Sequence, residues 1–164
     1  MDFRHLNAIT LKCKYLVPLI DDFLDELGKA SWFTSLDLTG YHQVRLKPGE
    51  AYKTAFQTHT GHHEFRVMAF GLSGAPGTFQ KAMNSTLAPL LRKCVLVFFD
   101  DILIYSNSYA EHLEHIQQVL QLLQKDQWKV KLSKCSFAQR QVTYLGHIIV
   151  SMVLLLILVR CQQC

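Results

Sequence analysis

The chain has 164 residues, of which 49% are hydrophobic and 18% charged, and its formal net charge is +4 with neutral histidines. This composition is that of a globular domain, or of part of one, and it excludes a disordered tail, a collagen-like chain and a small disulfide scaffold. The excess charge indicates a polyanionic partner only weakly. The excess of four positive charges lies in one segment, residues 125–140, which carries five basic side chains and one acidic side chain.

Five scattered cysteines and a start without a signal peptide predict free thiols in an intracellular protein that is not secreted. Cys161 and Cys164 form a lone C-x-x-C, and without a second pair we interpret it as a chance feature of the tail. Residues 152–159 form a run of eight apolar residues. A membrane span needs about 20 residues, so we expect no membrane association.

The first half of the chain contains one predicted helix and several short strands. Apolar side chains recur at helical spacing before Gly28, whereas residues 32–38 alternate, are rich in aromatic side chains and are followed by Gly40. A turn is expected at Pro48-Gly49, and a hairpin around Thr60-Gly61. The predicted helix is residues 18–27, and the predicted strands are residues 32–38, 43–46, 54–58 and 64–69.

The second half alternates between helices and hairpins. Helical spacing predicts helices at residues 75–91, with Pro76 in the first turn, and at residues 109–125. Strands are predicted at residues 94–99 and 102–105, and a last hairpin at residues 142–149 around Gly146. The mixed order predicts an α+β fold, an antiparallel sheet with helices on one side.

Two adjacent carboxylates, Asp100 and Asp101, interrupt the apolar runs CVLVFF and ILIY. Burying unpaired carboxylates is costly, so they lie either in an ordinary turn or beside bound cations. A third carboxylate, Asp37, lies in another aromatic-rich strand and could converge with them if the strands share a sheet. Mg²⁺ prefers such oxygen ligands, and two ions would stabilise a phosphoryl displacement. The pattern therefore favours the site of a nucleic-acid polymerase.

Longer blocks of sequence carry a specific resemblance. DFRHLNAIT, SWFTSLDL with GYHQVRL, FGLSGAPGTFQKAMN, FFDDILIYS, EHLEHIQQVLQLLQ with KVKLSKCSF, and YLGHII occur in colinear order over residues 1–150. Together they resemble the reverse transcriptase of gypsy-type LTR retrotransposons. The resemblance implies a polymerase palm with partial fingers and no complete thumb. It also implies an RNA-directed DNA polymerase that extends a primer on an RNA or DNA template with dNTPs, as part of a retrotransposon polyprotein in a cytoplasmic particle or the nucleus.

The same resemblance assigns roles to individual residues. Asp37, Asp100 and Asp101, with the backbone carbonyl of Leu38, would hold two Mg²⁺ ions, for which Mn²⁺ could substitute. Lys134 would assist the departure of pyrophosphate. Phe98 replaces the tyrosine of the family's Y-x-D-D box and keeps the ring. The expected nucleotide-binding residues are Tyr41, Phe70, Gly71 and Pro76, and the expected primer grip is Tyr144, Leu145 and Gly146.

Two departures from the family pattern leave an alternative open. Four residue steps separate Asp37 from Tyr41, where the family usually has five, and misplacement by about 1 Å can cost about 100-fold in rate. The family also has an N-terminal fingers strand before the segment that matches Asp2 and Arg4. The alternative is therefore a catalytically inactive, truncated remnant with at most weak nucleic-acid binding.

The expected domain organisation is a fingers and palm fragment at residues 1–150, followed by an unrelated apolar tail at residues 151–164. One codon choice for the tail, read in another frame, gives GVAADPSKVSAM, which is similar to the family's continuation, so we expect a frameshift. Histidines cluster on two segments, but too few ligands converge to favour zinc. The first cluster is His59, His62 and His63; the second, His112 and His115, is expected on a solvated helix face.

Overall fold

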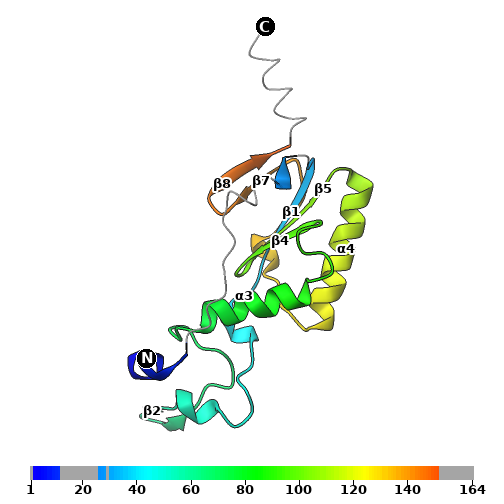
Figure 1. The fold of residues 1–164 in the computed structure, drawn as a ribbon. Coiled ribbons are helices and arrows are strands. Elements are labelled where there is room, and N and C mark those ends of the chain that lie inside the picture. Colours follow the sequence, from blue (N-terminus) through cyan, green and yellow to red (C-terminus); the bar gives the residue numbers. More distant parts are fainter. Residues whose placement is uncertain (1, 12–25, 29, 152–164) are drawn as a thin grey trace.

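The computed structural model describes residues 2–11, 26–28 and 30–151 (Figure 1). Its centre is a four-stranded antiparallel sheet with the strand order β4-β5-β1-β6. The continuous apolar runs at residues 95–98 and 102–105 fit strands that are covered on both faces. Their bounds are β4 (Val95–Phe98), β5 (Asp101–Ser106), β1 (Trp32–Asp37) and β6 (Ser136–Gln139).

Two helices, α3 (Ala75–Thr86) and α4 (Tyr109–Lys125), cover one face of this sheet (Figure 1). Alternate residues of each strand point to this face because the side-chain period of a strand is two. They form one buried core with the inner faces of the helices, so the predicted arrangement of sheet and helices is confirmed. The core includes Leu36, Val97, Ile102 and Ile104 from the sheet and Phe79, Met83, Val119 and Leu123 from the helices.

A hairpin of β7 (Gln141–Tyr144) and β8 (His147–Val150) packs on the other face. Val142, Tyr144 and Ile149 of the hairpin join the sheet residues that point to this side, Phe33, Leu96 and Leu103, in a second core. The hairpin turns at Leu145 and Gly146, with φ of 50° and 79°. Positive φ at both central positions is typical of the tight two-residue turns of hairpins. The predicted hairpin around Gly146 is confirmed.

Most of the remaining elements lie beyond the start of α3, away from the sheet, whereas residues 41–43 pack on α3 (Figure 1). They comprise a short helix, two turns of 3₁₀ helix and a two-stranded hairpin. A third 3₁₀ turn precedes β6. Their bounds are α1 (Arg4–Ile9), η1 (Tyr41–Gln43), η2 (Ala51–Thr54), β2 (Phe56–Thr58), β3 (Gly61–His63) and η3 (Leu132–Lys134).

Three predicted boundaries are wrong. The strand expected at residues 43–46 is replaced by η1 and a single bridge from Arg45 to Val67. The hairpin arm expected at residues 64–69 lies instead at Gly61–His63, because Thr58 pairs with Gly61 and closes the turn over two residues. α3 ends at Thr86 rather than residue 91, and Pro89, which lacks an N–H, disfavours continuation. The helix predicted at residues 18–27 lies largely outside the described residues; Glu26 and Leu27 are helical.

The expectation that His112 lies on a solvated face of α4 is also wrong. His112 is fully buried, and its ring bridges two strands of the sheet: Nε2 lies 2.8 Å from Thr34 Oγ1 and Nδ1 lies 2.8 Å from Ser106 Oγ. Ser106 Oγ also lies 2.7 Å from His115 Nδ1. Polar partners on β1 and β5 thus satisfy the ring nitrogens of a histidine that is buried on the inner face of α4.

The cysteines within the described part of the chain, Cys94 and Cys135, are free thiols, as expected. Among the described residues, no helix is long and apolar enough to cross a membrane.

Candidate functional site

Three aspartates meet at one end of the central sheet. Asp37 is the last residue of β1 and pairs in register with Asp101, the first residue of β5. Asp100 lies in the turn before Asp101, and its carbonyl accepts the Leu38 N–H at 3.0 Å. The two turn residues are Phe99 and Asp100, because Phe98 pairs with Asp101. The turn therefore lies one residue earlier than the Asp100-Asp101 turn that the sequence suggests. The expected convergence of Asp37 with the acidic hairpin is therefore present in the backbone.

Two of the three aspartates line one small cavity. Asp37 and Asp101 line this cavity of about 110 Å³ together with Lys134, Tyr144 and Leu145. The Lys134 Nζ donates to Asp37 Oδ2 at 3.1 Å. Asp100 is not among the lining residues; burial and the Asp100 carboxylate raise the pKa of Tyr41. The first cavity thus joins two predicted metal ligands to the predicted lysine and primer grip.

Burial raises the pKa of the Asp101 carboxyl, and the neighbouring carboxylates of Asp100 and Asp37 raise it further, against an opposing effect of Lys134. A raised pKa means that ionised Asp101 destabilises the folded protein at neutral pH, increasingly so as the pH rises from its ordinary value through the raised one. The site therefore carries more negative charge than its own basic side chain neutralises.

Asp101→Asn should consequently raise the thermal unfolding midpoint in EDTA at pH 7 by a few degrees, because a neutral amide replaces a destabilising charge. Differential scanning fluorimetry over pH 4–8 measures this effect, and the gain should shrink toward pH 4. Glu114→Gln, on the exposed face of α4, removes one negative charge elsewhere and should leave the midpoint unchanged. A midpoint for Asp101→Asn that is lower than wild type at pH 7 would contradict the prediction.

The donor set of the site fits a hard divalent cation in its chemistry. Carboxylate and carbonyl oxygens are the ligands that Mg²⁺ prefers, and three carboxylates at one sheet end repel each other unless cations neutralise them. Leu38, the expected carbonyl ligand, follows Asp37 in a single antiparallel bridge with Val130. In the described part of the chain, however, no three His, Cys, Asp or Glu side chains are gathered closely enough to hold an ion. The side chains therefore have the required type and strand positions but are not arranged around one point.

Gln80 of α3, which the sequence analysis did not select, holds the acidic turn in place. Its side chain is fully buried; Oε1 accepts the Phe99 N–H at 2.6 Å, and Nε2 donates to the Val97 carbonyl at 3.0 Å and to Asn84 Oδ1 at 2.9 Å. Phe99 has φ of 52°, a conformation that non-glycine residues rarely adopt without support. The available signal was a glutamine on the apolar inner face of a helix, between Phe79 and Met83.

Gln80→Met keeps the length of the side chain but leaves the buried Phe99 N–H without its acceptor. We expect a loss of about 1–3 kcal/mol in the free energy of unfolding, measured by urea denaturation. Gln118→Met, on the exposed face of α4, is the matched control and should have almost no effect. Equal stability of the two variants would show that the turn does not depend on the amide.

The short Asp37–Tyr41 connection still places Tyr41 beside the acidic turn. Its ring packs against Phe70 and Phe79, at centroid distances of 5.2 Å and 5.1 Å. Gly40 has φ of 89°, and its carbonyl accepts the Gln43 Nε2 at 3.4 Å, while Gln43 Oε1 accepts the Lys129 N–H. Gly40 and the Gln43 side chain thus form the bend between β1 and η1.

The segment at residues 70–76 lies across Tyr41 from the sheet. Phe70 is largely exposed, Gly71 has φ of 94°, and Pro76 lies in the first turn of α3. Asn7, another residue that the sequence analysis did not select, holds this segment: its Nδ2 donates to the Gly71 carbonyl and its Oδ1 accepts the Ser73 N–H, both at 2.8 Å. The predicted nucleotide-binding residues Tyr41, Phe70 and Gly71 are therefore neighbours.

The predicted primer grip is hydrogen-bonded to β5. The Tyr144 hydroxyl donates to the Asp101 carbonyl at 3.4 Å, and burial, then the nearby Asp101 charge, raises the pKa of this hydroxyl. The turn at Leu145 and Gly146 projects from this attachment. Of the predicted grip, Tyr144 and Leu145 line the same cavity as Asp37 and Asp101.

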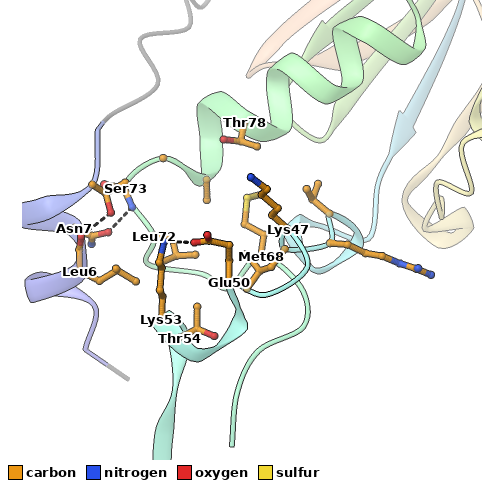
Figure 2. Close-up of a pocket in the computed structure, with 16 residues that line it drawn as sticks. Leu6, Asn7, Lys47, Glu50, Lys53, Thr54, Met68, Leu72, Ser73 and Thr78 are labelled. Atoms are coloured by element: carbon orange, nitrogen blue, oxygen red, sulfur yellow. Dashed lines mark hydrogen bonds and ion pairs between the residues drawn. The ribbon is translucent and has the colours of Figure 1, made fainter.

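A larger cavity, of about 390 Å³, lies between α1, residues 44–54 and the start of α3 (Figure 2). Its wall is mostly apolar, with Leu6, Met68 and Leu72, and Lys47 lies at its edge (Figure 2). None of the three aspartates lines it, so it is separate from the acidic site.

An antiparallel sheet with two helices on one face and paired aspartates at a strand end is the arrangement expected of a polymerase palm. Residues 1–149 match the family described as "Reverse transcriptase (RNA-dependent DNA polymerase)". The chain belongs to this family.

Individual relatives agree with the family match. The chain is 45% identical over 150 residues to the "Retrovirus-related Pol polyprotein from transposon 297" of Drosophila melanogaster, covering 91% of this chain but 14% of that polyprotein. It is 47% identical over 118 residues to the "RNA-directed DNA polymerase homolog" of Oenothera berteroana, covering 70% of this chain and 83% of that protein. The chain thus spans about one seventh of the polyprotein.

Solved structures agree on the fold. The foamy viral protease-reverse transcriptase in complex with double-stranded DNA superposes with a TM-score of 0.83 at 22% identity, covering 91% of this chain and 26% of that chain. The same enzyme in complex with an RNA/DNA hybrid gives a TM-score of 0.79 at 22% identity, covering 91% of this chain and 20% of that chain. The expected palm fold is confirmed.

Proposed function

We propose that this chain is the catalytic palm of an RNA-directed DNA polymerase, which extends a primer 3′-hydroxyl with dNTPs on an RNA or DNA template. The observation that carries the proposal is the in-register pair of Asp37 and Asp101, with Asp100 in the adjoining turn, in a chain of the reverse transcriptase family. Asp37, Asp100, Asp101 and the Leu38 carbonyl would hold two Mg²⁺ ions, or Mn²⁺ as a substitute. Bound there, such ions neutralise charge on the attacking and leaving oxygens.

The remaining roles follow from the neighbours of the aspartates. Tyr41, on its support of Phe70 and Phe79, would pack against the sugar of the incoming nucleotide. The Lys134 ammonium would stabilise the charge of the departing pyrophosphate. The turn of Tyr144, Leu145 and Gly146 would press on the primer backbone from its attachment to β5.

The proposed partners are a template-primer duplex and dNTPs, within a larger intracellular polyprotein. The foamy viral relatives of this fold are described in complex with an RNA/DNA hybrid and with double-stranded DNA, which supports a nucleic-acid duplex as partner. The basic segment at residues 125–140 would supply phosphate contacts, and such contacts make binding weaken steeply with salt.

Primer extension tests the proposal. Purified chain, oligo(dT) annealed to poly(rA), labelled dTTP and Mg²⁺ or Mn²⁺ should give extension products that disappear in Asp100→Asn. Salt-sensitive duplex binding without extension would instead support the inactive remnant. The comparisons do not favour that alternative.

Tyr41→Ala tests the nucleotide pocket. Removing the ring should open space beside the sugar and raise the use of rUTP relative to dTTP by about 10-fold or more, since the discrimination between the two sugars is steric. The ratio of kcat/KM for the two nucleotides is the measurement. Tyr52→Ala, an exposed tyrosine of η2, is the control and should keep the wild-type ratio. An unchanged ratio for Tyr41→Ala would place the sugar elsewhere.

We further propose that residues 151–164 are an apolar tail produced by a frameshift and distinct from the fingers and palm fragment at residues 1–150. The family match at residues 1–149 supports this division. The Ser151 N–H still donates to the Arg140 carbonyl at 3.0 Å, so the hairpin pairing extends by one residue. The rest of the tail lies outside the described residues. Codons that are incompatible with GVAADPSKVSAM in a second frame would contradict the frameshift.

A further inference from the structure

Lys134 reaches into the acidic site from a fixed backbone position. The Lys134 N–H donates to the Lys131 carbonyl at 2.9 Å, and the Lys131 N–H donates to the Asp37 carbonyl at 2.8 Å. These bonds hold the base of the lysine beside the end of β1 whether or not its side chain is paired. The ammonium then contacts Asp37 Oδ2, an atom that the proposed function assigns to a metal ion.

The two partners of this ion pair differ in exposure. The side chain of Lys134 is 56% exposed, whereas that of Asp37 is 18% exposed. The ammonium therefore approaches the carboxylate from the solvent side, and it can leave into water without any change in the protein core. A long lysine side chain on a fixed stem is well suited to such an exchange, because its charge remains hydrated in both positions.

Charge explains why the lysine occupies this position. The carboxylates of Asp37, Asp100 and Asp101 all raise the pKa of Lys134, and the hydrogen bond to Asp37 is the largest cause. Without a metal ion, the ammonium reduces the repulsion among these carboxylates. With a divalent ion on Asp37, the ammonium would face two positive charges at contact distance, which is strongly unfavourable. The metal ion and the lysine therefore compete for one carboxylate oxygen.

We propose that Lys134 is the exchangeable counter-cation of the acidic site: it occupies Asp37 when no metal is bound and is displaced when a divalent cation binds. This inference rests on the proposed function, because it assumes that Asp37 is a metal ligand. Displacement frees the ammonium for an anionic substrate group, so metal binding prepares Lys134 to meet the triphosphate. By linkage, a cation that displaces the lysine binds more tightly when the lysine is absent.

Direct Mn²⁺ binding, measured by isothermal titration calorimetry without nucleotide, is the first test. Lys134→Gln should bind Mn²⁺ about threefold to 10-fold more tightly than wild type, since an exposed ion pair and a nearby positive charge both oppose metal binding. Lys131→Gln removes one charge from an exposed residue of the same segment and should change the affinity less than twofold. Asp37→Asn should weaken binding.

Thermal unfolding provides a readout that a general charge effect would not give. In EDTA, Lys134→Gln should melt below wild type because the carboxylates lose their counter-cation. In saturating Mn²⁺ it should melt at or above wild type, whereas Lys131→Gln should keep the same small difference in both conditions. Reactivity of the Lys134 amine toward acetic anhydride, followed by mass spectrometry, should also rise on adding Mn²⁺.

The outcomes separate the two proposals. Equal Mn²⁺ affinities for wild type and Lys134→Gln, with weaker binding by Asp37→Asn, would overturn the counter-cation role and leave the metal site standing. Absence of Mn²⁺ binding by both wild type and Lys134→Gln would overturn the counter-cation role and also remove the metal site from the proposed function.

Discussion

Asp37→Asn and Asp100→Asn should each reduce primer extension by about 10³-fold or more. Each substitution replaces a charged oxygen ligand by a neutral amide, and metal-assisted charge stabilisation contributes several kcal/mol to such a displacement, where each 1.36 kcal/mol corresponds to about tenfold in rate. Single-turnover extension of a primed homopolymer RNA measures the effect, because it separates the chemical step from product release.

The loss should be one of rate and not of folding. The Asp37 ion pair is half exposed, and such pairs contribute about 1 kcal/mol or less, so both variants should keep the wild-type circular dichroism spectrum and a similar urea midpoint. Glu114→Gln, an exposed carboxylate on α4, is the matched control and should extend primers normally. Residual extension within tenfold of wild type in both aspartate variants would exclude them from the reaction.

Regular periodicity made three strands of the central sheet and its two covering helices predictable from sequence, whereas β6 was not predicted. The alternating strand at Trp32–Asp37, the helix at Tyr109–Lys125 and the two hairpins of the second half all lie where the apolar pattern places them. The helix has one apolar face that must be buried, and the strands carry apolar residues that must be buried in a sheet. Register then brings Asp37 opposite Asp101, so the location of the candidate site followed from strand pairing.

The supporting residues could not be predicted in the same way, because their partners are distant in sequence. Gln80 is 19 residues from Phe99, and Asn7 is 64 residues from Gly71. A buried amide or an asparagine within a short helix has no local pattern that distinguishes it from a solvated residue. The strand predicted at residues 43–46 is wrong for the same reason, since the Gln43 side chain accepts a hydrogen bond from Lys129 of a segment distant in sequence.

At the short Asp37–Tyr41 connection, tertiary contacts set the position of the Tyr41 ring together with the loop. Sequence spacing alone predicts a displaced aromatic ring. Gly40, with its positive φ, and the 3₁₀ turn at Tyr41–Gln43 nevertheless place that ring on Phe79, whose own position is fixed by the core beneath the sheet. The ring is thus positioned by the core, and the loop needs only to reach it.

His112→Asn should be among the most destabilising polar substitutions in the chain, at about 1–3 kcal/mol in the free energy of unfolding at pH 7. The shorter side chain cannot reach both Thr34 and Ser106, so at least one buried hydroxyl loses its hydrogen bond to residue 112. Thr34 Oγ1 also accepts the Ala138 N–H at 3.0 Å, and the loss therefore extends to the contact between β1 and β6. Urea denaturation followed by tryptophan fluorescence measures the effect.

The stability that His112 contributes should also depend on pH. Burial, then the nearby His115, lowers the pKa of His112 to about 4, whereas an unfolded chain protonates a histidine near its ordinary value of about 6.5. The neutral ring thus contributes stability that is fully present above pH 6.5 and is lost as the pH falls toward 4. The loss amounts to about 3 kcal/mol at most.

Asparagine does not titrate, so the difference in unfolding free energy between wild type and His112→Asn should narrow as the pH falls from 7 to 4. His59→Asn, at the exposed tip of the β2–β3 hairpin, should instead follow wild type at every pH. Parallel curves for wild type and His112→Asn would mean that His112 does not stay neutral in the folded protein. A narrowing difference would show that the histidine between α4 and β1 makes the stability of the fold depend on pH below neutrality.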